Sequence, residues 1–264
     1  MTPSLDHDRY CDEIIRQTEL LRAHLDGADL SVTVPTCPDW SLRDLAVHIG
    51  GAHRWAEQLV RTKATEEIPE EQVPGLLGPD GDDPAALDTW LADGAEGLAK
   101  ALRAAGPDTE VWTWAWEHRS GFWARRMAHE TVVHRADAAH AVRAEYVLAP
   151  EVAADTIDEW LEIVRFAQRT EPEDSAGELR GGGRSLHLHA TDTAPALNAE
   201  WLIEFGDDGF AWRRGHEKAT VALRGPLTDV LQVFYRRLPV DSERVEVLGE
   251  RELLAFWLER ATFG

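Results

Sequence analysis

The stretch RRMAHETVVHRADAAH spans residues 125–140 and lies inside a helix that we expect over residues 121–142. One face of this helix, reached in alternate steps of four and three residues, comprises Trp123, Met127, Glu130, His134, Asp137 and Ala141. The face begins apolar, so it should point into the interior of a helical bundle. Burying a carboxylate there without a partner costs several kcal/mol, and a bound metal ion is one way to compensate.

His129, directly before Glu130, suggests the H-E-x-x-H helix of zinc metalloproteases. His129 and His134 are five residues apart, however, so they lie roughly 140° apart around the helix and cannot both bind one ion. Glu130 and His134 are four residues apart and share a face. The spacing excludes the protease motif. An isolated E-x-x-x-H pair most often only forms a hydrogen bond or lines a solvated face.

A second helix is expected over residues 42–64, after the turn VPTCPDW, with Ser41 as its cap and Asp44 in its first turn. Gly50 and Gly51 should weaken this helix in the middle. His48 lies in one row with Leu45, Ala52, Trp55 and Leu59, and His53 lies in the adjacent row with Leu42, Ala46, Ile49 and Ala56. Periodicity does not choose between the two histidines.

One histidine from residues 42–64, together with Glu130 and His134, would give three protein ligands. Three ligands are typical of a catalytic zinc site with an open fourth position. Two nitrogens and one carboxylate suit Zn²⁺, and also fit Fe²⁺, Ni²⁺ or Mn²⁺.

The rest of the chain predicts an α+β fold with two domains, residues 1–170 and 171–264. Further helices are expected over residues 5–26, 83–105 and 150–169, with Asp83 as a cap before Pro84, and residues 65–82 form an exposed loop. The polar, glycine-rich stretch EPEDSAGELRGGGR then leads into period-2 runs. Residues 185–191 and 219–225 read as strands, residues 199–215 as a hairpin, and residues 226–238 and 250–262 as helices.

Composition narrows the function classes. The 264 residues carry a formal charge of −21, which disfavours binding to nucleic acid or to anionic membranes. The polar start MTPSLDHDRYCDE is unlike a secretory signal, and two cysteines suit a reducing cytoplasm. We expect a cytoplasmic protein that is a monomer or a weak homodimer. Phosphate-binding loops, dinucleotide fingerprints and G-x-S-x-G elbows are absent from the sequence.

Three segments carry a family resemblance: residues 34–56, residues 111–138, and the tail that begins with ATVALRGPLTDVLQVFYRRLP. They resemble the mycothiol-dependent maleylpyruvate isomerase family of actinobacteria, which belongs to the DinB-like metal-binding four-helix bundles. The resemblance implies a DinB-like bundle followed by a small C-terminal α+β domain. It places the metal ligands on His48, Glu130 and His134, and so favours His48 over His53. It also implies a catalytic arginine, best matched by Arg237 with Arg236 as its competitor.

The resemblance implies that the open metal position takes the thiol of mycothiol as a thiolate, with Zn²⁺ as the preferred ion. In the isomerase, this thiolate would add to the double bond of maleylpyruvate, while an arginine holds the substrate carboxylate. The same chemistry could serve a thiol S-transferase acting on another small electrophile. Asp137 is expected either to support a ligand or to pair with an arginine.

Two alternatives remain open. The chain could be a non-catalytic metal-binding or small-molecule-binding protein of the same superfamily, and a closed shell of four protein ligands would favour that interpretation. His187 and His189 share one strand face, but without an evident third ligand we interpret them as ordinary surface or packing histidines.

Overall fold

The computed structural model describes residues 5–81 and 83–262, and these form two compact units. The first runs from Leu5 to Tyr146, and the second begins at Val147. The α+β class is confirmed. The division between the units lies one helix earlier than the boundary expected at residue 170, because the helix over residues 150–170 packs with the C-terminal elements.

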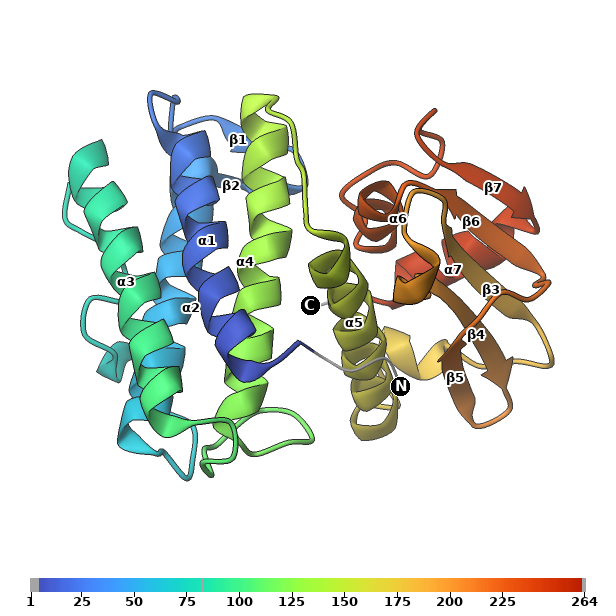
Figure 1. Cartoon of the computed structure of the whole chain (residues 1–264), viewed down its shortest axis with the longest axis horizontal. Helices are drawn as coiled ribbons and strands as arrows, with labels where there is room; N and C mark the ends of the chain where they lie inside the picture. Colours follow the sequence, from blue (N-terminus) through green and yellow to red (C-terminus); the bar gives the residue numbers. More distant parts are fainter. Residues whose placement is uncertain (1–4, 82, 263–264) are drawn as a thin grey trace. The chain divides into compact units, whose positions relative to one another are not determined.

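The N-terminal unit is a bundle of four long helices (Figure 1). Its helices are α1 (His7–Leu25), α2 (Leu42–Thr62), α3 (Pro84–Ala105) and α4 (Ser120–Val142). Helix α1 packs against α3 and α4, and α2 packs against the same two helices. The segment expected as a turn before α2 instead forms a small hairpin of β1 (Thr33–Val34) and β2 (Cys37–Ser41).

The helix starts follow the capping chemistry of the sequence. Ser41 and Asp44 form a reciprocal capping box at the start of α2, and the Asp83 side chain accepts a hydrogen bond from the backbone of Ala85 at the start of α3. These contacts satisfy backbone N–H groups that the helices themselves leave unpaired. The predicted caps are confirmed, and they fix where α2 presents its histidines.

Aromatic side chains pack between α2 and the start of α4. Trp55 of α2 and Trp123 of α4 meet edge to face, with ring centroids 5.2 Å apart. Trp112, from the segment before α4, contacts both rings, and its carbonyl accepts a hydrogen bond from the Trp123 indole. This packing anchors the first turn of α4 against α2, the two helices that carry His48, Glu130 and His134.

The glycine pair does not interrupt α2, which is one continuous helix. A Cβ at Gly50 would overlap the ring of Trp90 on α3, and one at Gly51 would lie 2.9 Å from the carbonyl oxygen of Leu76. The two glycines therefore let Trp90 and the backbone of Leu76 approach α2 closely, at some cost in helix propensity.

Gly50→Ala is expected to lower the free energy of unfolding by about 1–2 kcal/mol, since overpacking costs about 1–3 kcal/mol and the gain in helix propensity returns up to about 1 kcal/mol. Gly97→Ala on α3 is the matched control. Its Cβ would meet nothing within 4 Å, so it should stabilise the protein by about 0.5–1 kcal/mol. Urea unfolding of both variants measures the difference, and equal effects would contradict the close approach of Trp90.

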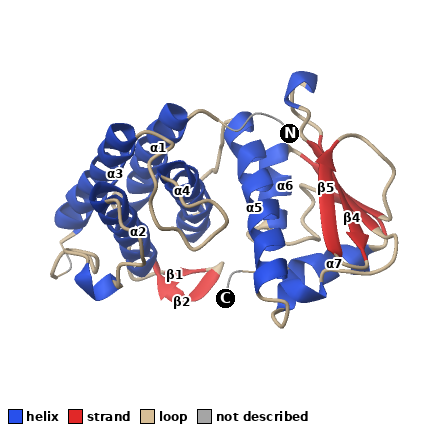
Figure 2. Ribbon diagram, turned by 90° about the horizontal axis from the view of Figure 1, so that it is seen from below, coloured by secondary structure: helices blue, strands red, loops and turns tan. Residues whose placement is uncertain are grey.

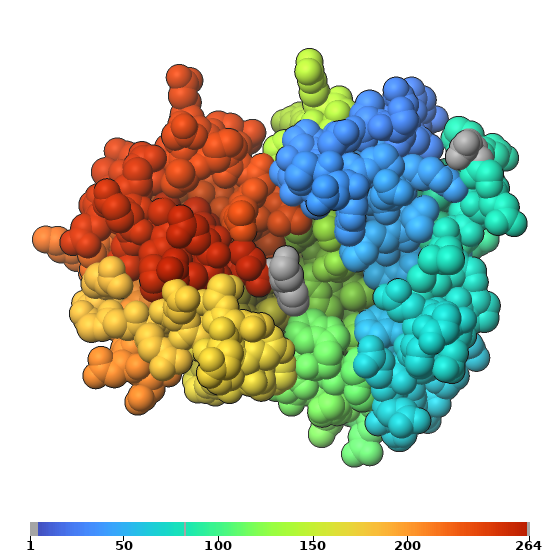
Figure 3. Space-filling view, turned by 180° about the vertical axis from the view of Figure 1, so that it is seen from behind, coloured from blue at the N-terminus to red at the C-terminus, as the bar shows by residue number. Residues whose placement is uncertain are grey.

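The loop between α2 and α3 lies on the surface, as expected (Figure 3). It contains one short 3-10 helix, η1 (Glu70–Gln72), and Val73 is buried beside it. Position 82 lies outside the described residues.

The C-terminal unit begins with α5 (Pro150–Thr170) and builds a five-stranded sheet in the order β5-β4-β3-β6-β7. The strands are β3 (Ser185–Ala190), β4 (Glu200–Gly206), β5 (Gly209–Arg214), β6 (Val221–Gly225) and β7 (Glu246–Gly249). In this sheet β3 and β6 pair in parallel, and the other neighbouring strands pair antiparallel. The remaining helices are α6 (Leu227–Phe234), α7 (Arg251–Arg260) and the short 3-10 helices η2 (Ser175–Glu178) and η3 (Pro195–Leu197).

Helices α5 and α6 lie on one side of this sheet (Figure 2). Trp201 of β4 faces that side, because its indole donates to Asp158 of α5 over 2.7 Å. Trp257 of α7 stacks on Phe234 of α6 and meets Phe210 of β5 edge to face. Because side chains alternate along a strand, the neighbours of Trp201, including Glu200, point to the opposite face.

Candidate metal centre

The structure brings the three expected ligands together inside the N-terminal unit. His48 comes from α2, and Glu130 and His134 come from consecutive turns of α4. Glu130 Oε1 lies 3.0 Å from His48 Nε2 and 3.2 Å from His134 Nε2. The donor atoms of the three residues all lie within 4.8 Å of one another. Two imidazole nitrogens thus converge on one carboxylate oxygen.

Glu130 is held so that one of its oxygens faces the histidines. Its other oxygen, Oε2, accepts from the buried guanidinium of Arg126 one turn earlier, at 2.5 Å. Burial favours the neutral acid, but the charges of Arg126 and His134 outweigh burial and hold the pKa of Glu130 well below its ordinary value. Glu130 is therefore ionised near neutral pH. Its Oε1 is the oxygen that remains for a metal ion, because Oε2 accepts from Arg126.

His134 is oriented by Asp137, three residues later on the same helix. The Nδ1 of His134 lies 2.8 Å from Oδ2 of Asp137, which is fully buried. With Nδ1–H donating to the carboxylate, the lone pair of the neutral ring is on Nε2 and points towards Glu130 and His48. Thr36 in turn donates to the other oxygen of Asp137 at 2.5 Å.

The hairpin before α2 adds neighbours that the sequence did not reveal. Trp40 lies against both histidine rings, with centroids 4.8 Å from His48 and 6.0 Å from His134. Cys37 Sγ lies 4.0 Å from Asp137 Oδ2, so Cys37, His134 and Asp137 form a second possible donor group. That group would use Nδ1 of His134, which Asp137 already occupies, so the Nε2 side is the better metal position.

His53, the alternative left open by periodicity, points elsewhere. It is fully buried, and its Nε2 lies 2.8 Å from the hydroxyl oxygen of Thr131. Burial lowers its pKa to about 3, so it stays neutral. His53 is a core residue that packs α2 on α4, whereas the His48 side chain is 37% exposed and open to a ligand.

Arg237 lies in the C-terminal unit, three residues after the end of α6. Its backbone N–H donates to Gln232, and its guanidinium donates to the carbonyl of Tyr235 at 2.9 Å. Arg236 adopts a left-handed backbone conformation, with φ of 62°. The catalytic role expected for Arg237 stays a prediction.

The contacts of His134 predict that metal binding at this candidate site depends on pH. Burial alone would lower its pKa, but the hydrogen bonds to Asp137 and Glu130 outweigh burial and raise the pKa to about 9. At pH 7 the metal-free ring is therefore protonated, whereas a metal ligand must be neutral. Zn²⁺ binding here at pH 7 is expected to release about one proton, and affinity should fall about tenfold per pH unit below the pKa.

Calorimetric titration with Zn²⁺ in two buffers of different ionisation enthalpy counts these protons. The His134→Ala variant is the control, because it should lose Zn²⁺ binding at this site and the proton release that accompanies it. Equal proton release by the intact protein and the His134→Ala variant at pH 7 would contradict the raised pKa of His134.

None of the helices in the described part of the chain combines the length and the apolar character needed to span a bilayer.

Two solved structures resemble the chain along most of its length. One is the mycothiol-dependent maleylpyruvate isomerase, with a TM-score of 0.56 and 17% sequence identity. The other is a histidine-to-alanine mutant described under the same name, with a TM-score of 0.53 and 16% identity. Each comparison covers 92% of this chain and 93% of the other. At this identity the likeness establishes a shared fold. No curated protein matches the sequence.

Family models separate the chain into the same two parts. The model of the mycothiol maleylpyruvate isomerase N-terminal domain matches residues 11–139, and the model of the C-terminal domain of that family matches residues 151–256. The second match begins with α5, in agreement with the division into units seen in the structure. Both models match in the order expected for one protein, so the chain belongs to the mycothiol maleylpyruvate isomerase family.

Proposed function

We propose that the protein is a mycothiol-dependent metalloenzyme in which a thiol adds to a small electrophile. The observation that carries this proposal is the convergence of His48 Nε2 and His134 Nε2 on Glu130 Oε1. Family membership supports the choice of mycothiol, because the similar solved structures are of a mycothiol-dependent enzyme.

The donor set fits a divalent ion, and we propose Zn²⁺ held by His48, Glu130 and His134. Two neutral imidazoles and one carboxylate are ordinary zinc ligands, and three protein ligands leave one position for an exogenous group. When bound, the ion supplies a Lewis acid that favours the thiolate form of a thiol near neutral pH. We place the ion on the Nε2 side of His134, where the Glu130 oxygen is not occupied by Arg126.

The residues around the proposed ion position hold the ligands in the required protonation state and orientation. Asp137 fixes the tautomer and ring orientation of His134, Arg126 keeps Glu130 ionised, and Trp40 covers one side of both histidines. The partly exposed His48 leaves a route for the thiol. We further propose that Arg237 binds a substrate carboxylate in bidentate fashion, with Arg236 as the alternative.

Two reactions fit the proposal: isomerisation, as in maleylpyruvate isomerase, and S-transfer to another electrophile. The two reactions differ in whether mycothiol is consumed. An isomerase regenerates mycothiol after each turnover, whereas an S-transferase consumes one thiol for each electrophile. Incubating the protein with mycothiol and maleylpyruvate, and separately with an aryl halide, while counting free thiol, distinguishes the two.

A non-catalytic metal-binding or small-molecule-binding role is the second candidate. The partly exposed third ligand favours the enzyme, since a purely structural ion is usually enclosed by four protein ligands. Failure of mycothiol to accelerate either reaction above the rate of the His134→Ala variant would support the non-catalytic role. We also propose a cytoplasmic monomer or weak homodimer that binds neither nucleic acid nor membranes.

A further inference from the structure

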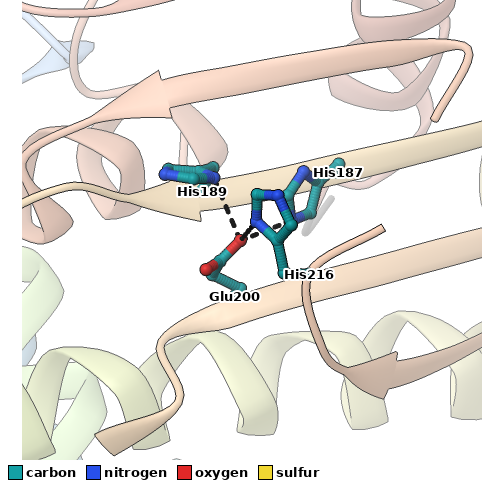
Figure 4. A group of neighbouring side chains, drawn as sticks. All are labelled: His187, His189, Glu200 and His216. Carbon is teal, nitrogen blue, oxygen red and sulfur yellow. Dashed lines mark hydrogen bonds and ion pairs between the residues drawn. The ribbon is translucent and has the colours of Figure 1, made fainter. Parts of the chain in front are cut away.

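We propose that His187, His189, Glu200 and His216 form a second Zn²⁺ site, located within the C-terminal unit. Figure 4 shows three imidazole rings arranged around one carboxylate of that unit. The donor atoms of all four residues lie within 4.8 Å of one another. Among the residues that the structure describes, this is the possible metal-binding group with the most members.

The register of strands β3 and β4 brings three of the four side chains together. His187 and His189 alternate along the central strand β3 and therefore project from the same face. Glu200 opens β4 and pairs directly with His189 across the antiparallel ladder. Since Trp201 faces α5, the histidines and Glu200 occupy the face away from that helix.

The fourth residue arrives from the chain that follows β5. The backbone N–H of Gly215 donates to the carbonyl of Glu200 over 3.0 Å, which holds this segment beside the start of β4. His216, the next residue, then turns its Nδ1 to within 2.7 Å of Glu200 Oε2. Its side chain is 72% exposed, so an ion can enter from this side.

The three rings are placed almost evenly. Their centroids are 5.3, 5.4 and 5.5 Å apart, and every pair meets edge to face. His187 Nε2 and His189 Nδ1 lie 2.9 and 3.0 Å from the same oxygen, Glu200 Oε2. With His216 Nδ1 at 2.7 Å, one nitrogen of each ring therefore lies within 3.0 Å of that oxygen.

Hydrogen bonding alone does not explain this arrangement. A carboxylate oxygen has two lone-pair directions and so accepts two good hydrogen bonds, whereas three nitrogens surround Oε2. His216 Nδ1 makes a hydrogen bond to Oε2, whereas His187 Nε2 is buried and close to Oε2 but out of line for a hydrogen bond. A buried polar atom without a hydrogen bond destabilises the fold, unless a bound metal ion accepts its lone pair.

A divalent ion accounts for all four side chains at once. Three imidazole nitrogens and one carboxylate oxygen are a suitable tetrahedral donor set for Zn²⁺. In such a site the ligand atoms lie roughly 3.3 Å apart, so closure here needs side-chain movements on the order of 1 Å. With four protein ligands the shell is closed, and the ion joins β3, β4 and the segment after β5 as a structural element.

The test is a count of Zn²⁺ bound by the full chain after removal of metal with a chelator. The starting variant is His48→Ala/His134→Ala, which lacks the N-terminal ligands, so that only the second site is measured. We expect one equivalent of Zn²⁺ in this variant, and a rise of several degrees in Tm when Zn²⁺ is added.

Adding His216→Ala to that variant should remove the equivalent and the rise in Tm. Because His216 is exposed, its loss should leave the fold intact, and Glu200→Gln provides a second, nearly isosteric variant. His118→Ala, at another exposed histidine, is the matched control and should still bind one equivalent.

Absence of Zn²⁺ binding in the His48→Ala/His134→Ala variant would overturn the second site, and so would unchanged binding after His216→Ala or Glu200→Gln. Neither result bears on the thiol chemistry proposed for the N-terminal unit.

Discussion

Replacing His48 with alanine is expected to weaken Zn²⁺ binding at the N-terminal site by roughly 100- to 1000-fold. Zinc sites with four protein ligands contribute about 10–16 kcal/mol, or about 2.5–4 kcal/mol per ligand, and each 1.4 kcal/mol is a factor of ten. His48 is partly exposed, so the variant should fold. Competition with a coloured chelator, in a chain that carries His216→Ala, measures this site alone.

His53→Ala is the matched control, one turn away on the same helix. His53 is fully buried and bonded to Thr131, so its loss should destabilise the fold by about 1–3 kcal/mol. Zn²⁺ affinity should stay within about threefold of the parent, since His53 is not a ligand. An equal loss of Zn²⁺ affinity in His48→Ala and His53→Ala would contradict the assignment.

Asp137→Asn is expected to lower Zn²⁺ affinity at the same site by about 10- to 100-fold, although Asp137 is not a ligand. The substitution keeps the size of the side chain but removes the charge that raises the basicity of His134. Without that charge the pKa of His134 should be lower, so less of the metal-free ring is protonated at pH 7. The proton release on Zn²⁺ binding should therefore decrease together with the Zn²⁺ affinity.

Asp158→Asn controls for the loss of the charge of a hydrogen-bonded, partly buried carboxylate elsewhere in the chain. Asp158 accepts from Trp201 and Arg214 within the C-terminal unit, so its loss affects stability alone. Unchanged Zn²⁺ affinity in Asp137→Asn would show that Asp137 does not position His134.

The helices and the α4 half of the site could be predicted from the sequence because both depend on local patterns. Ser41 and Asp44 mark the start of α2 three residues apart, and Glu130 and His134 share a face because they are four residues apart. The choice between His48 and His53 is not local. Both rows of α2 lie against other helices, and only packing reveals that His53 meets Thr131 while His48 meets Glu130.

The domain boundary and the second cluster could not be predicted, for a related reason. The change in composition after residue 170 marks the end of α5, but it does not reveal which helices α5 packs against. His187 and His189 form a visible pair in the sequence. Their partners Glu200 and His216 come from β4 and from beyond β5, and they become neighbours only through strand register.

The central claim is that His48, Glu130 and His134 hold an ion to which mycothiol binds through sulfur. The most direct measurement is titration of the Co²⁺-substituted protein with mycothiol, followed by its ultraviolet thiolate-to-metal charge-transfer band. The expected result is a saturable band that is lost in His48→Ala and is weaker with an unrelated thiol such as cysteine. The absence of a band with mycothiol, or an equal band in His48→Ala, would contradict the claim.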